Sequence, residues 1–290
     1  MDIYSIIAII VMLGAVALAY LKRFSLTQLL IIGNLVVFMV EVIGSVNQMA
    51  QELGFKPIYL QTGDNLYTLF TGLFIHASFV HLIGNMLFLF LIGVPLEERV
   101  GKAKFAAIYF IAGFVGTLLE SMVRWGSPLP IIGASGAIAG AIGGMFILYP
   151  RDRIPMFLGP ILLPNVPVWA AALSFFAFQL YYVFVDVGST VAYSAHLGGF
   201  VMGMLAGQLI PSRSKEEKLK TIRTEGLAEL ATTPQLKSAL DRIDSESQPD
   251  VRKAWLEYFA HHVKCPKCGG KLHLKGSTLR SDCGYEVELK

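Results

Sequence analysis

The chain has 290 residues, of which 54% are hydrophobic and 16% are charged. Because soluble proteins carry about 25% charged residues, this composition excludes an ordinary soluble protein. The formal net charge of +3 is small and the basic residues sit in predicted loops and near the C-terminus, so we expect no nucleic-acid partner. Charged residues are sparse before Pro211 and frequent after it, which predicts a long membrane part followed by a soluble tail.

Seven stretches are apolar enough to cross a bilayer, which takes about 20 residues of helix. They cover residues 3–20, 27–46, 80–95, 104–122, 132–149, 167–186 and 190–210. The first has Asp2 before it and Lys22 after it, not a basic N-terminal region, which favours a retained membrane anchor over a cleaved signal peptide. The sequence therefore predicts an all-α polytopic membrane protein.

The basic residues of the short loops predict the orientation of these spans, since Lys and Arg accumulate on the cytoplasmic side. Alternate loops are rich in them: Lys22, Arg23, Arg99, Lys102, Lys104, Arg151 and Arg153. The opposite loops hold Lys56 and Arg124. We therefore expect a multi-pass protein of the cell membrane with its N-terminus outside and the tail from Pro211 in the cytoplasm.

Polar side chains of three spans fall at one depth, near the outer ends of helices that run inward. His81 and Asn85 share a face of the third span because they lie four residues apart. Ser135 lies near the outer end of the fifth span, and His196 lies about two turns into the seventh. A hydroxyl nucleophile needs an adjacent base, so the pattern predicts Ser135 as the nucleophile and His196 as the base. Asn85, His81 and the N–H of Ser135 are then candidate donors to the oxyanion of the reaction intermediate.

Glycines predict how these spans bring the two side chains together. The fifth and seventh spans carry glycine at every fourth position: Gly136, Gly140 and Gly144, and Gly199, Gly203 and Gly207. This small-xxx-small pattern lets membrane helices approach closely. If the two sets of glycines face each other, the Ser135 hydroxyl and the His196 imidazole meet.

Each of these residues also has an interpretation without catalysis. A serine in a span often bonds to its own helix backbone, and an intramembrane histidine can be an ion or proton site of a transporter or channel. Asn85 can tie helices together, and His76 is interpreted as a structural residue under the outer loop. A transporter predicts polar residues at mid-membrane, whereas those here gather on the outer side. The sequence has no H-E-x-x-H motif, which argues against a metalloprotease of that class.

Three motifs lie at these positions: Gly133–Ala137 (GASGA), Ala195–Gly203 (AHLGGFVMG) and His81–Asn85 (HLIGN). They resemble the GxSG, AHxxGxxxG and HxxxN motifs of the rhomboid family of intramembrane serine proteases. Further similarities to the family are His76, the turn Glu97–Gly101 (EERVG), Asn34 and Phe38. The resemblance covers about residues 27–210, with the motifs in the family's order.

The resemblance implies a six-helix core, here the second to seventh spans, with the first span as an extra N-terminal helix. It implies a serine endopeptidase whose Ser–His dyad lacks an acid and needs no cofactor for catalysis. Its substrates would be single-span membrane proteins, cut within the lipid bilayer near their outer boundary. An outer loop at about residues 47–75 would lie partly in the membrane, and the aromatic-rich sixth span would flank a lateral entry for substrates. The alternative is a non-catalytic rhomboid-like protein that binds or escorts membrane helices, although such proteins typically lack the Ser or the His.

The sequence departs from the family at two positions. Several members carry Tyr four residues after the nucleophile, stacked on the base, whereas this chain has Ala139. Two alternatives stay open: another residue, such as an aromatic residue of the sixth span, orients His196 in its place, or the dyad is looser. Many members have Arg in the outer loop where this chain has Thr68, so we expect the loop to be held differently.

The tail predicts short amphipathic helices over residues 214–231, 234–243 and 250–262, with Pro234 and Pro249 near helix N-termini. The end of the tail resembles a zinc ribbon, with Cys265, Cys268 and Cys283 as metal ligands. Structural zinc takes four ligands, and Arg280 stands where the second cysteine pair would be completed. Two alternatives stay open: a fourth ligand from His261, His262 or His273, or a ribbon that folds without metal.

We therefore expect four parts along the chain. They are an N-terminal transmembrane anchor (1–24), a rhomboid-like core (25–211), a soluble helical region (212–262) and a zinc-ribbon-like module (263–290). The odd number of cysteines in a cytoplasmic tail argues against a disulfide framework. A small α+β tail on the cytoplasmic side suits binding of a cytoplasmic partner.

Overall fold

A computed structural model describes the chain over residues 1–22, 24–158, 161–186, 191–209, 225–246, 249–275 and 278–288. The chain divides into two compact units, Met1–Ser212 and Arg213–Lys290. The first unit holds the apolar helices, and the second holds the charged C-terminal sequence.

All seven apolar stretches form helices. Among the described residues, five helices are long and apolar enough to cross a membrane: α1 (Ile3–Leu21), α2 (Leu26–Ile43), Phe79–Val100, α8 (Lys102–Val123) and α10 (Val168–Val185). The remaining two, α9 (Ser135–Leu148) and α11 (Tyr193–Leu209), are shorter, with 14 and 17 residues. The predicted class of all-α polytopic membrane protein is confirmed.

The third stretch is longer than the predicted range of 80–95. It runs through α6 (Phe79–Phe88), a π-helical turn η2 (Leu89–Gly93) and α7 (Val94–Val100) without a break. The sequence does not predict that the helix continues to Val100, because it includes the charged residues Glu97–Arg99, and charged residues are not expected within a span. The predicted boundary was therefore too early by about one helical turn or more.

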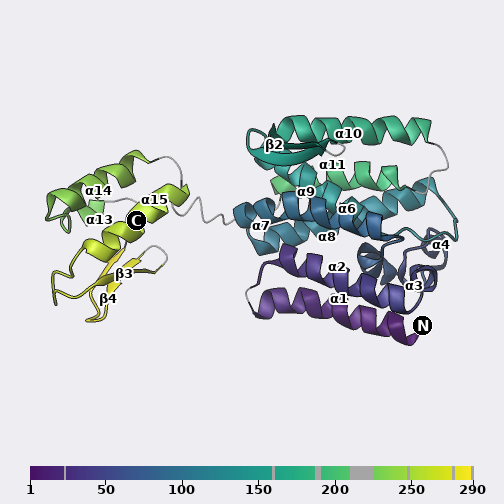
Figure 1. Cartoon of the computed structure of the whole chain (residues 1–290), viewed down its shortest axis with the longest axis horizontal. Coiled ribbons are helices and arrows are strands. Elements are labelled where there is room, and N and C mark those ends of the chain that lie inside the picture. The colour runs from purple at the N-terminus through teal and green to yellow at the C-terminus, as the bar shows by residue number, and fades with distance from the viewer. Residues whose placement is uncertain are drawn as a thin grey trace. The chain divides into compact units, whose positions relative to one another are not determined.

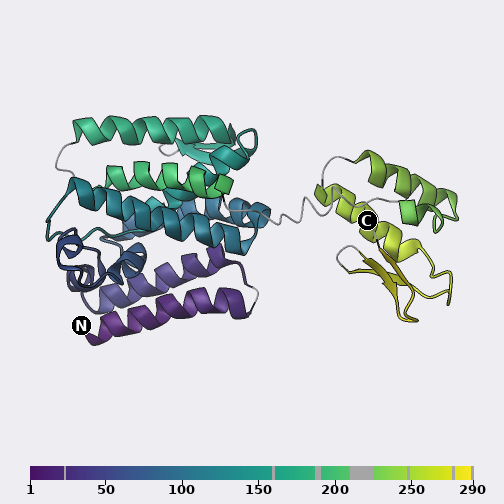
Figure 2. The ribbon, with the colours of Figure 1, turned by 180° about the vertical axis from the view of Figure 1, so that it is seen from behind.

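Figure 1 shows α1 and α2 at one edge of the first unit and α10 at the opposite edge, with α6, α8, α9 and α11 between them. The view from behind gives the same order (Figure 2). Helix α9 is enclosed by its neighbours, since every residue from Gly136 to Met145 is buried. A helix that faces protein on all sides does not meet lipid, so it need not match the thickness of the bilayer.

The glycines of α9 and α11 face each other, as their spacing predicts. A Cβ atom at Gly199 would overlap the carbonyl oxygen of Gly136, and a Cβ atom at Gly203 would overlap that of Gly140. The two backbones are therefore in direct contact, which only glycine allows. This contact brings the N-terminal ends of both helices together.

A buried carboxylate fixes the start of α2. Glu97 of α7 accepts hydrogen bonds from the N–H groups of Leu26 and Thr27, at 2.8 and 2.7 Å. It also accepts hydrogen bonds from the hydroxyls of Ser25 and Thr27, at 2.8 and 2.7 Å. The first N–H groups of a helix have no partner within it, and a negative charge is favourable there. Gly101, with a φ of 81°, then turns the chain into α8, as the resemblance of this turn implies.

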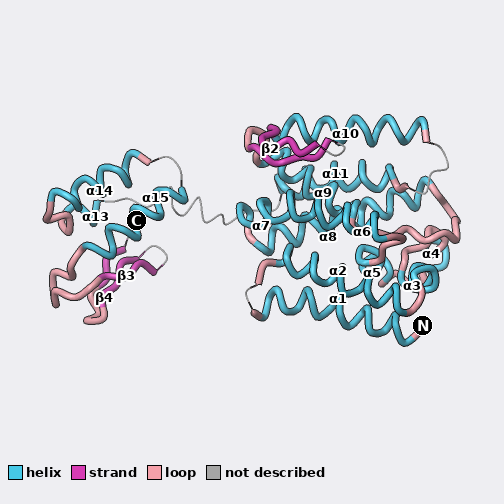
Figure 3. The backbone as a smooth tube through the Cα atoms, in the orientation of Figure 1, coloured by secondary structure: helices cyan, strands magenta, loops and turns pink. Residues whose placement is uncertain are grey.

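The outer loop contains four short helices: α3 (Val46–Leu53), α4 (Tyr59–Thr62), α5 (Thr68–Thr71) and η1 (Gly72–Phe74). They gather at one end of the first unit (Figure 3). Phe55 and Ile131 exchange backbone hydrogen bonds of 3.1 and 2.7 Å, which join this loop to the segment before α9. Thr68 is buried, and its hydroxyl donates to the carbonyl of Asn65 at 2.6 Å, so a local bond holds the loop at this position.

An antiparallel hairpin of β1 (Arg153–Leu158) and β2 (Ile161–Pro167) connects α9 to α10. The sequence does not predict this hairpin, because the prolines of its strands, Pro155, Pro164 and Pro167, disfavour strands. They are tolerated because a sheet of two strands leaves one edge of each strand without a partner strand. The register of the pair also shifts between Ile154 and Met156, at Pro155.

The second unit packs helices on a three-stranded antiparallel sheet. Its elements are α13 (Glu225–Ala228), α14 (Pro234–Ser245), α15 (Pro249–His262), β3 (Leu272–Lys275), β4 (Thr278–Ser281) and β5 (Glu286–Glu288). The predicted helices over 234–243 and 250–262 are confirmed, and both begin at a proline, which suits the first helical position. Most of the predicted helix over 214–231 lies outside the described residues. A small core that includes Leu236, Phe259 and Leu279 holds the helices to the sheet.

Candidate active site

Ser135 is the first residue of α9 and follows a turn that depends on glycine. Gly133 has a φ of 107°, which L side chains rarely adopt. A Cβ atom at Gly133 would also lie 2.8 Å from the imidazole ring of His81. The N–H of Gly133 donates to the carbonyl of Gly72 at 2.8 Å, so the outer loop fixes the turn. As the first helical residue, Ser135 presents an N–H that has no partner within the helix.

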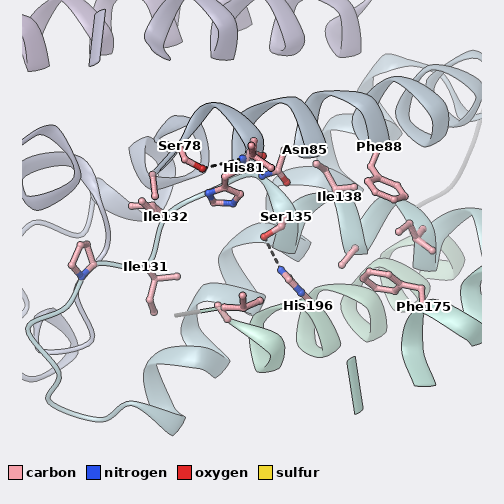
Figure 4. A pocket seen from close by; sticks show the side chains of 18 of the residues that line it. Ser78, His81, Asn85, Phe88, Ile131, Ile132, Ser135, Ile138, Phe175 and His196 are labelled. Atoms are coloured by element: carbon pink, nitrogen blue, oxygen red, sulfur yellow. Dashed lines mark hydrogen bonds between the residues drawn. The ribbon is translucent and has the colours of Figure 1, made fainter. Parts of the chain in front are cut away.

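His196 lies in the first turn of α11, and both of its ring nitrogens are bonded. Nε2 lies 2.7 Å from the Oγ of Ser135, and Nδ1 lies 2.7 Å from the Oε1 of Gln179 on α10. An amide oxygen only accepts hydrogen bonds, so Nδ1 carries the proton and Nε2 offers its lone pair to the hydroxyl. The two side chains, 61 positions apart in the chain, are thus brought together (Figure 4).

No sequence motif points to Gln179. The available signal was an amide within the apolar stretch 167–186, because a polar group in hydrocarbon needs a partner. The aromatic neighbour expected from the sixth span is Phe175, whose ring centroid lies 6.3 Å from that of His196. The hydrogen bond that His196 Nδ1–H donates to Gln179 is the more direct constraint on the imidazole, since it fixes the tautomer as well as the position. Ala139, at the position where family members carry Tyr, lines the cavity beside them.

His81 and Asn85 lie on one face of α6 and line the same cavity as Ser135 and His196. Ser78 caps α6 by accepting a hydrogen bond from the N–H of His81 at 3.2 Å. The side-chain N–H of Asn85 donates to the carbonyl of His81 at 3.0 Å. Figure 4 shows Ser135 between these two residues on one side and His196 on the other. The four predicted site residues therefore meet in one pocket.

His76 lies behind this pocket and is fully buried. Its ring packs against that of His81 with 5.0 Å between the centroids, and its Nδ1 lies 3.3 Å from the carbonyl oxygen of Phe74. The backbone N–H of His76 donates to a side-chain oxygen of Glu41 at 3.3 Å. His76 does not line the cavity. These contacts fit the structural role that the sequence predicts for it.

The cavity has a volume of about 710 Å³. Its walls are mostly apolar and include Phe88, Ile131, Ile132, Ile138 and Phe175. The polar side chains among them include Ser135, His196, His81 and Asn85. An apolar pocket with a few convergent polar groups is the usual form of a site that binds and orients an organic ligand.

Glu120, like Gln179, is a residue that no sequence motif marks as functional, and it fixes the start of α11. Glu120, buried near the end of α8, pairs with Arg124 at 2.6 Å. Its carboxylate also accepts hydrogen bonds from the hydroxyl of Ser194 at 2.7 Å and from the N–H of Ala195 at 3.3 Å. Both donors directly precede His196, so this acidic residue of an apolar helix sets the position of the imidazole.

The three cysteines of the second unit also gather in space. The Sγ atoms of Cys265, Cys268 and Cys283 lie within 4.8 Å of one another, so these residues can hold a metal ion. Burial raises the pKa of Cys265, but hydrogen bonds from the N–H groups of Cys268 and Lys267 contribute to a net decrease to about 6. A thiol with such a pKa is largely a thiolate at neutral pH, the form that binds metals.

The fold and the pocket define a polytopic membrane protein with a serine and a histidine in hydrogen-bond contact. A family model described as "Rhomboid domain" matches residues 63–213, just over half of the chain. The chain therefore belongs to the rhomboid family.

Several curated proteins are similar to this chain. Rhomboid protein 1, mitochondrial, of Saccharomyces cerevisiae is 31% identical over 157 residues, which are 53% of this chain and 44% of that protein. Rhomboid-like protease 3 of Toxoplasma gondii is 33% identical over 140 residues, 48% of this chain and 49% of that protein. Rhomboid protease GluP of Bacillus subtilis is 30% identical over 153 residues, 53% of this chain and 28% of that protein. The similarity thus spans less than half the length of each of these relatives.

Proposed function

We propose that the chain is an intramembrane serine endopeptidase in which Ser135 is the nucleophile and His196 is the base. The observation that carries this proposal is the 2.7 Å hydrogen bond between the Ser135 hydroxyl and the His196 Nε2. This bond lies in a cavity that has room for a peptide segment. The names of two relatives, Rhomboid-like protease 3 and Rhomboid protease GluP, support peptide-bond hydrolysis.

In this mechanism His196 takes the proton of Ser135 while the Oγ attacks a peptide carbonyl carbon. The imidazolium then gives its proton to the leaving amine, and an acyl-enzyme remains. Water, activated by the same imidazole, attacks the ester and releases the second product. Gln179 keeps Nε2 directed at the hydroxyl throughout, because it holds the other ring nitrogen at 2.7 Å.

The oxyanion of the tetrahedral intermediate would lie on the side of Ser135 that faces α6. The donors available there are the N–H of Ser135 and the side chains of Asn85 and His81. Oxyanion donors are most effective when they are fixed before the reaction. Asn85 is held by the carbonyl of His81, and His81 packs on the buried ring of His76.

The substrates in this proposal are single-span membrane proteins cut near the outer boundary of the bilayer. A substrate helix hides its carbonyl groups in hydrogen bonds, so the cleaved segment has to unwind before Ser135 reaches a carbonyl. Small or helix-breaking residues near the cut are therefore favoured. The alternative is a non-catalytic protein that binds membrane helices, but the hydrogen-bonded Ser135 and His196 favour the protease.

The orientation and the four-part division also remain proposals. Lys and Arg in alternate loops favour an N-terminus outside the cell membrane and a cytoplasmic tail. The division into an anchor, a protease core and two tail regions is consistent with the compact units Met1–Ser212 and Arg213–Lys290. In this orientation the second unit is available to a cytoplasmic partner.

A fluorophosphonate probe, which reacts with activated serines, tests the proposal. The purified protein in detergent micelles is expected to be labelled at Ser135 only. Ser135→Ala and His196→Ala should lose the label, because each removes one member of the reacting pair. Ser127→Ala, in the outer turn before α9, should keep it, since the hydroxyl of this serine accepts a hydrogen bond from the N–H of Leu129 at 3.2 Å and does not line the cavity. Labelling of Ser135→Ala equal to that of the parent would exclude Ser135 as the nucleophile.

The role of Gln179 is tested by two substitutions of similar size. Gln179→Met removes the acceptor for Nδ1–H, so kcat is expected to fall at least about tenfold with little change in KM, as for a base that loses its orienting partner. Gln179→Glu keeps an acceptor oxygen and should restore most of kcat. Leu180→Met, on an exposed face of the same helix, serves as the control. A kcat equal to that of the parent in both Gln179→Met and Gln179→Glu would show that Gln179 only fills space.

A further inference from the structure

The second unit brings together cysteines from two loops that are separate in the sequence. Cys265 and Cys268 lie directly after α15, whereas Cys283 lies between β4 and β5. The Sγ atoms of Cys265 and Cys283 are 3.6 Å apart, and all three Sγ atoms lie within 4.8 Å of one another. Three sulfur atoms at such distances surround a point from which each is within reach of one metal ion.

Both loops are tight turns whose backbones aim the thiols at the same point. In the first, Cys265 N donates to the carbonyl of Gly270 and Gly269 N donates to that of Cys265, both at 2.8 Å. In the second, Ser281 N donates to the carbonyl of Tyr285 at 2.9 Å. Gly269 and Gly284 both have a positive φ, 70° and 84°, which these turns require. Such turns hold the thiols in place without a disulfide between them.

We propose that the second unit binds one Zn²⁺ ion through the thiolates of Cys265, Cys268 and Cys283, with a water molecule as the fourth ligand. Thiolates are soft ligands, and a tetrahedral set of them suits zinc. No histidine belongs to this cluster among the described residues. His262 is engaged elsewhere: its Nδ1 bonds to the carbonyl of Tyr258 at 2.8 Å, and its ring stacks on that of Tyr258.

Ser281 lies beside the three cysteines, next to the position that a fourth zinc ligand would occupy. Its hydroxyl lies 3.4 Å from the Sγ of Cys268, and its side chain is buried. Arg280 points elsewhere, since it pairs with Glu286 at 2.9 Å. A neutral hydroxyl is a poor zinc ligand, but it can donate a hydrogen bond to a thiolate. Position 281, not 280, is therefore the place where a fourth thiol would complete the site.

The ion would connect the end of α15 to the turn between β4 and β5. Cys265 and Leu279 belong to the small core of this unit, together with Phe259 at the end of α15. Small domains with limited cores gain much of their stability from such cross-links. Loss of zinc is therefore expected to loosen the second unit while the membrane unit keeps its fold.

The full chain, purified in detergent without chelators, is expected to contain one zinc per chain by inductively coupled plasma mass spectrometry. Cys265→Ser, Cys268→Ser and Cys283→Ser should each lower zinc affinity at least about a hundredfold. Ser281→Cys should raise it at least about tenfold, because a thiolate replaces water. Ser245→Cys adds an exposed thiol on α14 and should leave the affinity unchanged.

Limited proteolysis of the parent chain with and without a zinc chelator reports the stability of the second unit independently of these variants. Removal of zinc should speed cleavage after residue 225 and leave the membrane unit intact. The proposal is overturned if the purified chain binds no zinc in titration, or if Cys265 and Cys283 are found joined in a disulfide. It is also overturned if Ser281→Cys and Ser245→Cys change the affinity equally. Fluorophosphonate labelling of Ser135 is a separate measurement, so failure here and failure of the protease proposal are distinguishable.

Discussion

Replacing Ser135 with alanine is expected to lower the rate of substrate cleavage by at least about a thousandfold. The substitution removes the Oγ that lies 2.7 Å from the His196 Nε2, and no other hydroxyl has this contact with the imidazole in the described part of the chain. The measurement uses proteoliposomes that contain the purified protein and a single-span substrate with helix-breaking residues near its outer boundary. Cleavage is followed as the release of a labelled fragment.

The Ser135→Ala protein should otherwise resemble the parent. The first turn of α9 accepts alanine without strain, so helix content and the unfolding midpoint are expected to change little. Ser127→Ala should cleave at the parent rate. If Ser135→Ala retains more than about a tenth of the parent rate, the acyl-enzyme mechanism is wrong.

Replacing Gly203 with alanine is expected to destabilise the membrane unit by about 1–3 kcal/mol. The added Cβ would overlap the carbonyl oxygen of Gly140, and a backbone atom cannot move aside as the end of a side chain can. Helices α9 and α11 would have to separate, which also parts Ser135 from His196. The measurement is the free energy of unfolding in mixed micelles of mild detergent and sodium dodecyl sulfate, followed by circular dichroism.

Gly14→Ala is the matched control for this substitution. Gly14 lies in α1, and apart from the neighbouring residues and backbone of α1 itself, a Cβ atom at this position would have no atom of the described chain within 4 Å. Alanine is the better helix former by about 1 kcal/mol, so this variant should be as stable as the parent or slightly more stable. Equal stability of Gly203→Ala and Gly14→Ala would contradict direct backbone contact between α9 and α11.

Much of the membrane unit follows from local signals in the sequence. Apolar length predicts where the helices lie, and glycine at every fourth residue predicts which two helices are in backbone contact. These signals are strong because the bilayer requires every backbone group to be paired within a helix. The hairpin formed by β1 and β2 is not predicted from the sequence, since prolines argue against strands. They are acceptable here because the sheet has only two strands, so that each strand is an edge strand.

Part of the pocket is also predictable from the sequence, because polar side chains are rare in membrane spans. Ser135, His196, His81 and Asn85 stand out as polar side chains in apolar stretches, and depth in the membrane places them together. Gln179 and Glu120 stand out in the same way, but no spacing rule joins them to His196. Their partners are set by how α10 and α8 pack against α11, which is tertiary information that a single sequence does not carry.

In the proposed protease, the bond between Gln179 and His196 has a consequence for how a substrate enters the pocket. Helix α10 is the least enclosed of the long apolar helices, with 17% of its span buried compared with 44% for α8. An outward tilt of α10 by a few ångströms would break a 2.7 Å bond to the imidazole. In the proposed mechanism the pocket would then be open to lipid, but His196 would lack the partner that orients it. Hydrolysis would resume only when α10 has moved back and the bond between Gln179 and His196 has formed again.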